Sequence, residues 1–175
     1  FRVLINNRKL IDALLGSCGI YEIPRQKHVL RVIDKMAKVG AQSVRLELGP
    51  GRIDDSGDPI PGVKLDPPTI DKILAFVDIQ GATRTDVVDH LAKLLVESPE
   101  SAIALAEMRE LAEVLTALGV DEDHAKFDPG LARGLDYYTG PVFECVIPDA
   151  PQFGSVMGGG RYNGLVGRFL DREIP

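Results

Sequence analysis

The change of hydrophobic periodicity along the chain limits the folds that it can adopt. Apolar residues recur at helical spacing through most of residues 24–119, as in the run from Ile70 to Val77. Short extended runs lie on either side, at Phe1–Ile5 and after Val120, where proline and glycine separate them. The pattern predicts an α+β fold in which a mostly helical segment interrupts a sheet domain, with antiparallel strands after Val120.

Three domain segments follow from this pattern. Residues 1–23 supply a strand and a helix of the sheet domain, residues 24–120 form the mostly helical insertion domain, and residues 121–175 return to antiparallel strands. The extended runs in the last segment are 125–127, 131–132, 142–147 and 154–157. The sheet is therefore expected to bring together parts of the chain that lie far apart in the sequence.

Caps and breakers mark where the helices begin and end. Asn6-Asn7 offers an N-cap for the first helix, and the second is expected to run from Pro24 to Gly40. Ser98 precedes a proline and an acid, a pattern typical of the first turn of a helix. The segment from Gly49 to Pro68 is rich in glycine, proline and aspartate, and this composition predicts a loop or a small hairpin.

The charge of the chain argues against a protein that binds nucleic acid over its whole surface. It carries 20 basic and 26 acidic residues, for a formal net charge of −6. Basic residues nevertheless gather between Pro24 and Gly40, opposed only by Asp34. They are Arg25, Lys27, Arg31, Lys35 and Lys38. Any contact with RNA is expected there, although a solvated helix face would explain the same charges.

Neither a membrane segment nor a metal site is indicated. No apolar run approaches the ~20 residues that a membrane helix needs. Cys18 and Cys145 lie far apart without a C-x-x-C spacing, and the histidines are scattered along the chain. No protein-bound metal is therefore predicted.

Two short tracts combine arginine, tyrosine and glycine. RGLDYYTG, residues 133–140, is termed the first signature, and GGGRYNG, residues 158–164, the second signature. An arginine can bond a phosphate or carboxylate through two parallel N–H groups, and glycine lets a backbone pass close to a ligand. The tracts match neither common nucleotide loop, because G-K-[ST] is absent and Asn163 stands where a third glycine would belong. Both tracts are therefore predicted to hold a ligand by other means.

The two signatures, with the residues that follow them, resemble the signature segments of histidyl-tRNA synthetase, a class II aminoacyl-tRNA synthetase. The matching stretches are RGLDYYTGPVFE and GGGRYNGL. The opening FRVLINNRKLIDALL is similar to the strand and helix start that follow motif 2 in that family, and the family's insertion domain would occupy the stretch between. Motif 1, the motif 2 arginine, motif 3 and the anticodon-binding domain have no counterpart. The chain is thus interpreted as a fragment that is expected to be inactive alone.

The resemblance implies an activity and its partners. The parent protein would activate histidine with ATP, accompanied by Mg²⁺, to histidyl-adenylate and would transfer the histidyl group to tRNA(His). It would be a cytoplasmic homodimer without membrane association. A synthetase-like regulatory paralogue that binds histidine or tRNA without catalysis is the alternative. The intact Arg133 and tyrosines, together with the large insertion, favour the synthetase.

The resemblance also implies roles for single residues. Arg133 corresponds to a catalytic arginine at the α-phosphate of ATP, whereas the residues alone also allow an ion pair with Asp136. Tyr138 and Tyr162 would line the histidine pocket, because a phenol offers a flat packing surface and a hydrogen-bonding tip.

Four further residues are candidates for the substrate site. By the resemblance, Gly159 and Gly160 would form the pocket wall, although the residues alone also allow a tight sheet crossing, and Arg161 could be structural or could face the ligand. Tyr137 would point to the opposite face if its segment is extended, since side chains alternate along a strand, and this alternation favours a structural role. No acid–base role is assigned to Glu144, because adenylate formation needs positioning more than proton transfer.

Overall fold

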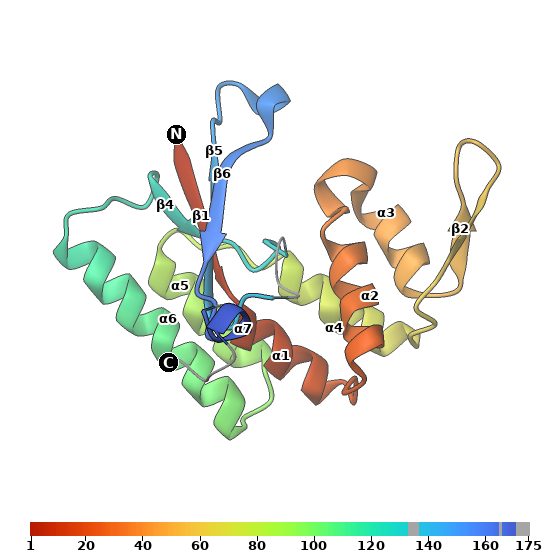
Figure 1. Ribbon diagram of the computed structural model, residues 1–175, viewed down its shortest axis with the longest axis horizontal. Coiled ribbons are helices and arrows are strands. Elements are labelled where there is room, and N and C mark those ends of the chain that lie inside the picture. Colours follow the sequence, from red (N-terminus) through yellow and green to blue (C-terminus); the bar gives the residue numbers. More distant parts are fainter. Residues whose placement is uncertain (133–136, 165, 171–175) are drawn as a thin grey trace.

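β1 (Arg2–Asn7) lies inside a four-stranded sheet of order β4-β1-β5-β6 (Figure 1). β4 (Ala125–Phe127) runs parallel to β1. β5 (Pro141–Val146) pairs with β1 and β6 (Ser155–Gly160) pairs with β5, both in antiparallel fashion. Segments from the two ends of the sequence thus share one sheet, which confirms the predicted α+β fold.

Helices fill most of the chain between β1 and β4. The computed structural model describes residues 1–132, 137–164 and 166–170. The α-helices of these residues are α1 (Arg8–Ser17), α2 (Ile23–Ile33), α3 (Met36–Leu48), α4 (Pro67–Val77), α5 (Arg84–Leu94), α6 (Pro99–Ala117) and α7 (Gly167–Leu170). A hairpin of β2 (Gly51–Ile53) and β3 (Pro59–Pro61) lies between α3 and α4, and a 3₁₀ turn (Pro151–Phe153) lies between β5 and β6. Within the described ranges, no helix combines the length and the hydrophobicity needed to cross a membrane.

Two details of the sheet differ from the prediction. β4 is parallel rather than antiparallel to β1, because the chain returns to the sheet through a long helical crossover, which allows a parallel pair. Residues 131–132 do not form a strand. The carbonyl oxygen of Leu131 instead accepts a hydrogen bond from the side chain of Asn6 at 2.9 Å.

Most predicted helix boundaries are confirmed. The Asn7 side chain caps α1 by accepting a hydrogen bond from the Lys9 N–H at 3.0 Å, and Ser98 caps α6 within a capping box. The second helix is different: α2 ends at Ile33 and the helix resumes at Met36. Gly40, the predicted stop, does break the helical geometry, with a φ of 79° and a ψ of 163°, but helical residues follow it as far as Leu48. The reason is tertiary, since Val44 and Leu48 beyond the kink are fully buried.

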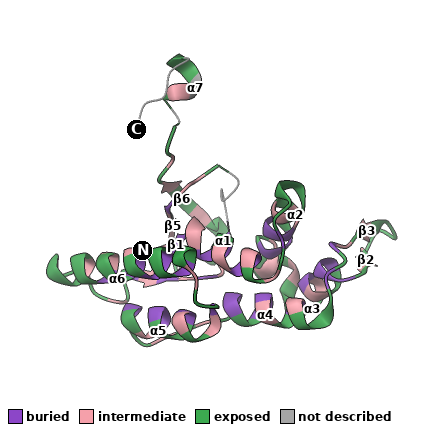
Figure 2. Ribbon diagram, turned by 90° about the horizontal axis from the view of Figure 1, so that it is seen from below, coloured by how far each residue is buried: buried purple, intermediate pink, exposed green. Residues whose placement is uncertain are grey.

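One hydrophobic core connects the sheet to the helices. Leu115 of α6 lines the same apolar hollow as Val3 and Ile5 of β1, so the end of α6 faces that side of the sheet. The sheet, α1, α5 and α6 lie toward one end of the molecule, whereas α2, α3 and the hairpin lie toward the other (Figure 1). Buried positions line the inner sides of the helices at both ends (Figure 2), and they belong to one core. The division into segments 1–23, 24–120 and 121–175 stays a prediction.

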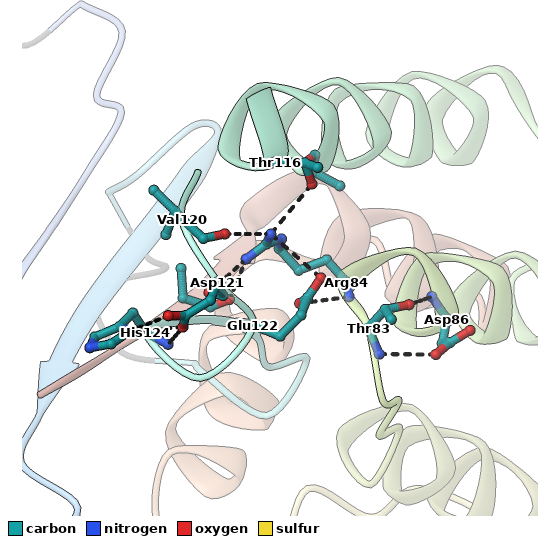
Figure 3. A network of polar contacts seen from close by, with 10 residues as sticks. Thr83, Arg84, Asp86, Thr116, Val120, Asp121, Glu122 and His124 are labelled. Carbon is teal, nitrogen blue, oxygen red and sulfur yellow. Dashed lines mark hydrogen bonds and ion pairs between the residues drawn. The ribbon is translucent and has the colours of Figure 1, made fainter. Parts of the chain in front are cut away.

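A buried arginine ties α5 to the segment that leads into β4 (Figure 3). Arg84 is 3% exposed, and its guanidinium donates to the carbonyl oxygens of Val120, Asp121 and Ala125 at 2.9–3.1 Å. Glu122 forms an ion pair with it at 3.4 Å. These bonds pair most of the N–H donors of the buried Arg84 guanidinium. They also fix the position of the segment that leads into β4.

The β2–β3 hairpin is held by a buried carboxylate, which agrees with the predicted loop or hairpin. Glu47 of α3 is 1% exposed and pairs with Lys35 at 3.0 Å and with Arg52 at 2.9 Å. Burial raises the pKa of Glu47, but the hydrogen bonds and charges of Lys35 and Arg52 outweigh it, and the pKa lies below its ordinary value. The carboxylate is therefore charged in the folded chain at neutral pH.

Candidate functional site

The two signatures lie side by side where β5 begins and β6 ends. Val142 pairs with Gly160 in the ladder, and the Arg161 N–H donates to the Pro141 oxygen at 2.9 Å. The Thr139 N–H donates to the Arg161 oxygen at 2.8 Å, and the Thr139 hydroxyl accepts from the Asn163 N–H at 3.0 Å. The described part of the first signature is therefore fixed against the second signature.

A pocket of about 320 Å³ lies against the joined signatures. It is lined by Leu131, Tyr137, Tyr138, Phe143, Glu144, Ser155, Val156, Met157, Gly158 and Gly159. The ring centroid of Tyr137 lies 4.3 Å from that of Tyr138 and 5.7 Å from that of Tyr162. Three tyrosine rings thus cluster beside a pocket that a carboxylate also borders.

Glycines in the second signature permit close packing around these rings. A Cβ atom at Gly160 would lie 2.8 Å from the Tyr138 ring, so the ring rests directly on the glycine backbone. A Cβ atom at Gly159 would meet nothing within 4 Å. The side chain of Arg161 passes over Gly140, where a Cβ atom would lie 3.1 Å from it, and its Nε donates to the Asn163 amide oxygen at 3.0 Å.

The predicted site residues divide into three groups. The structure places Tyr138 and Gly159 in the lining of the pocket. Tyr162 and Gly160 are not part of that lining but lie against the Tyr137 and Tyr138 rings, and Arg161 lies next to them on the exposed surface. The extended segment that would turn Tyr137 to the opposite face is not formed: residue 137 lies in a turn, and its ring lies against the Tyr138 ring and lines the pocket. Arg133 and Asp136 lie outside the described residues.

The pocket adjoins a larger cleft of about 980 Å³. Leu131, Glu144 and Ser155 line both hollows. Lys35 and Lys38, from the turn between α2 and α3 and the start of α3, line the cleft as well. Two of the predicted basic residues therefore border the cleft that adjoins the pocket of the signatures.

The remaining basic residues lie on α2 and do not form a single stripe. Arg25, Lys27 and Arg31 are all exposed. Arg31 lies one turn after Lys27 and donates to its backbone oxygen at 3.3 Å, whereas Arg25 reaches the Lys64 oxygen at 3.4 Å. Only Lys27 and Arg31 share a side of the helix, because residues four apart are neighbours on its surface.

Carboxylates also border the cleft. Burial raises the pKa of Asp128, and the nearby charge of Glu144 raises it further, although a hydrogen bond from the Gly130 N–H at 2.9 Å opposes this. In the ranges that the structure describes, no group of three or more His, Cys, Asp or Glu side chains could hold a metal ion.

Sequence reasoning missed a polar cluster at the junction of β1 and α1. Glu107 of α6 accepts hydrogen bonds from the Asn7 amide at 2.8 Å and from Lys9 at 2.5 Å. Burial raises the pKa of Glu107, but these bonds outweigh it and leave the pKa below its ordinary value. The Arg8 N–H donates to the Gly140 oxygen at 2.9 Å, so the same junction holds the first signature. Because Glu107 lies 98 positions from Lys9, no local pattern could reveal it.

Comparison with known proteins supports the relationship that the signatures suggest. A sequence model of the histidyl-tRNA synthetase family matches residues 60–175, a range that includes both signatures. The histidine–tRNA ligase of Paracoccus denitrificans is 43% identical over 183 residues, which cover 100% of this chain. The chain spans 37% of the length of that relative.

Solved structures agree with the sequence match. The histidyl-tRNA synthetase of Nostoc sp. PCC 7120 is 31% identical with a TM-score of 0.81, over 98% of this chain and 37% of that chain. A Bacillus halodurans protein, described as an ATP phosphoribosyltransferase regulatory subunit/histidyl-tRNA synthetase, has a TM-score of 0.73 at 24% identity over 98% of this chain and 39% of its own, which shows the fold alone. With a family model that covers more than half of its residues, the chain belongs to the histidyl-tRNA synthetase family.

Proposed function

We propose that the protein carrying this chain activates histidine with ATP and transfers the histidyl group to tRNA(His). The observation that carries the proposal is the joining of the two signatures around one pocket. The pocket has aromatic walls, phenol groups and the Glu144 carboxylate, and its volume of about 320 Å³ suits a small polar ligand.

The tyrosines fit an imidazole as substrate. Neutral imidazole has one donor and one acceptor nitrogen, so a selective pocket needs polar groups of both kinds. The hydroxyls of Tyr138 and Tyr162 can donate or accept, and the Tyr137 ring adds a packing surface beside them. A side chain that lacks matching groups would leave these partners unpaired and would be rejected.

Arg133 is the proposed catalytic residue, by the resemblance of the first signature. Negative charge gathers on the α-phosphate of ATP while the histidine carboxylate attacks it, and a fixed guanidinium would stabilise that charge without first having to be protonated. ATP would enter as its Mg²⁺ complex and as a substrate. Loss of one such contact costs about 10²–10³ in rate.

The tRNA would approach through the basic residues that border or flank the cleft. Lys35 and Lys38 line the cleft, although Lys35 already pairs with Glu47, and Lys27 and Arg31 lie exposed on α2. We expect Lys38→Ala and Arg31→Ala each to weaken tRNA binding and to reduce its salt dependence, because phosphate contacts release counterions. A flat salt response in the unaltered protein would reject this part of the proposal. The resemblance further suggests a cytoplasmic, class II homodimer.

Histidine-dependent ATP–pyrophosphate exchange tests the proposal. The full-length protein, its Arg133→Ala variant and the present chain are compared under the same conditions. We expect exchange in the full-length protein, a loss of about 10²–10³ in the variant and none in the present chain. A folded full-length protein without exchange would contradict the proposal and would favour a regulatory paralogue that only binds histidine or tRNA.

A further inference from the structure

Thr139 of the first signature directly follows Tyr138 and bonds the backbone on both sides of Tyr162. Its N–H donates to the Arg161 oxygen at 2.8 Å, and its hydroxyl accepts from the Asn163 N–H at 3.0 Å. The same hydroxyl donates to the Arg161 oxygen at 3.4 Å. One side chain thus fastens the residue after Tyr138 to the residue after Tyr162.

The hydroxyl bond lies beyond the end of the regular β5–β6 ladder. The pairing of β5 with β6 reaches Val142 and Gly160, and the bond from the Arg161 N–H to the Pro141 oxygen continues it by one step. The second signature then enters a turn at residues 163–164. The bond at the Asn163 N–H therefore depends on a side chain and not on the ladder, so a single substitution can remove it.

The rings that this bond holds together include two that line the pocket. Tyr137 and Tyr138 both belong to the lining, and their ring centroids lie 4.3 Å apart. The Tyr162 ring lies outside the lining, with its centroid 5.7 Å from that of Tyr137. A movement of residue 163 away from residue 139 would therefore shift Tyr162 and loosen the packing of the two pocket rings.

We propose that Thr139 is a positioning residue for the Tyr137 and Tyr138 rings, acting through the bond of its hydroxyl to the Asn163 N–H. This inference rests on the proposed binding of histidine in the pocket and adds a residue to its support. Groups that are fixed before binding lose less freedom when the ligand arrives, so loosened rings bind histidine less tightly. A loss of this kind raises KM more than it lowers kcat.

The test uses the full-length protein with Thr139→Val, Thr139→Ala and Thr139→Ser. Valine has the shape of threonine without its hydroxyl, whereas serine keeps the hydroxyl. In ATP–pyrophosphate exchange, we expect Thr139→Val to raise the histidine KM by about 3- to 10-fold, the worth of one hydrogen bond between neutral groups, and to change kcat by less than about threefold. Thr139→Ala should show the same loss and still reports if the valine variant does not fold. Thr139→Ser should restore the histidine KM.

A matched control and two further readouts accompany the kinetics. Thr69→Val removes a hydroxyl that donates to the Asp66 carboxylate at 2.9 Å, at the start of α4 and outside the pocket lining, and should leave the histidine KM unchanged. Hydrogen exchange at the Asn163 amide should become faster in Thr139→Val but not in Thr69→Val. In a Tyr138→Phe background, Thr139→Val should raise the histidine KM by a smaller factor, because both changes weaken the same contact.

The outcomes separate this inference from the proposed function. An active wild-type protein with a normal histidine KM in Thr139→Val and Thr139→Ala, or with unchanged exchange at the Asn163 amide, would overturn the positioning role alone. An equal rise of the histidine KM in Thr139→Ser or in Thr69→Val would also overturn it, as would an undiminished effect in the Tyr138→Phe background. A wild-type protein that shows no ATP–pyrophosphate exchange would refute the proposed function and the inference together.

Discussion

Replacement of Gly160 by alanine tests whether the second signature forms the seat of the Tyr138 ring. The added Cβ would lie 2.8 Å from two ring atoms of Tyr138 and 3.0 Å from the Pro141 oxygen. The ring cannot simply move away, because Tyr138 packs against the hydrophobic core. Either the ring or the β5–β6 backbone must shift to make room.

The expected cost follows from this overlap. Overpacking of a well-packed site costs about 1–3 kcal/mol, which corresponds to a fall of about 2–12 °C in Tm for a chain of this size. Gly159→Ala is the matched control: it adds the same methyl group one residue earlier, in open space, and should change stability by less than about 0.5 kcal/mol.

Urea and thermal unfolding of this chain measure the free energy of unfolding and the Tm of both variants against those of the unaltered chain. The cause is isolated by repeating Gly160→Ala in a Tyr138→Ala background, where the missing ring removes the closest overlap and leaves the 3.0 Å approach to the Pro141 oxygen. Most of the Gly160→Ala cost should then disappear. Equal effects of the two glycine substitutions, or a Gly160→Ala cost that persists without the Tyr138 ring, would refute the packing of this ring on the second signature.

Two further predictions concern the buried charges that shape the fold. Arg84→Met should lower the free energy of unfolding by about 1–3 kcal/mol, since it leaves the carbonyl oxygens of Val120 and Ala125 without the donors of Arg84. Arg109→Met, which removes an exposed 3.3 Å pair with Asp89, should cost less than about 1 kcal/mol, and similar losses in chemical denaturation would contradict the role of Arg84. Glu47→Gln should lower Tm at pH 7. Because the folded pKa of Glu47 is depressed, its contribution is complete above the ordinary value of 4.5 and is lost as the pH falls through the folded pKa, so the Tm difference should fade only under acid conditions.

Local chemistry made much of the fold predictable. The Asn7 and Ser98 caps, the hairpin before Pro67 and the strand at Ala125–Phe127 all depend on residues close in sequence, and each is confirmed. The end of α2 at Ile33 was not predictable, because neither proline nor glycine stands at residues 34–35, where the helix is interrupted. The parallel direction of β4 likewise follows from the path of the crossover rather than from the strand itself.

The candidate site shows the same division. Tyr138, Tyr162 and the glycines could be recognised because they belong to short tracts of unusual composition. The supporting residues could not, since Asn6 reaches Leu131 across 125 positions and Lys9 reaches Glu107 across 98. The pair Asn6-Asn7 did carry a weak signal of these long-range bonds. The N-cap of α1 needs only Asn7, and Asn6 bonds the backbone of Pro129 and Leu131 instead.

The central claim is that the two signatures together form the histidine site. Hydrogen exchange of the full-length protein, with and without saturating histidine, tests it most directly. We expect histidine to slow exchange in both signatures, at Thr139 and at Arg161 and Asn163, and to have a weaker effect in the Tyr138→Ala variant. Protection that is confined to other parts of the protein, or that persists unchanged in Tyr138→Ala, would contradict the account.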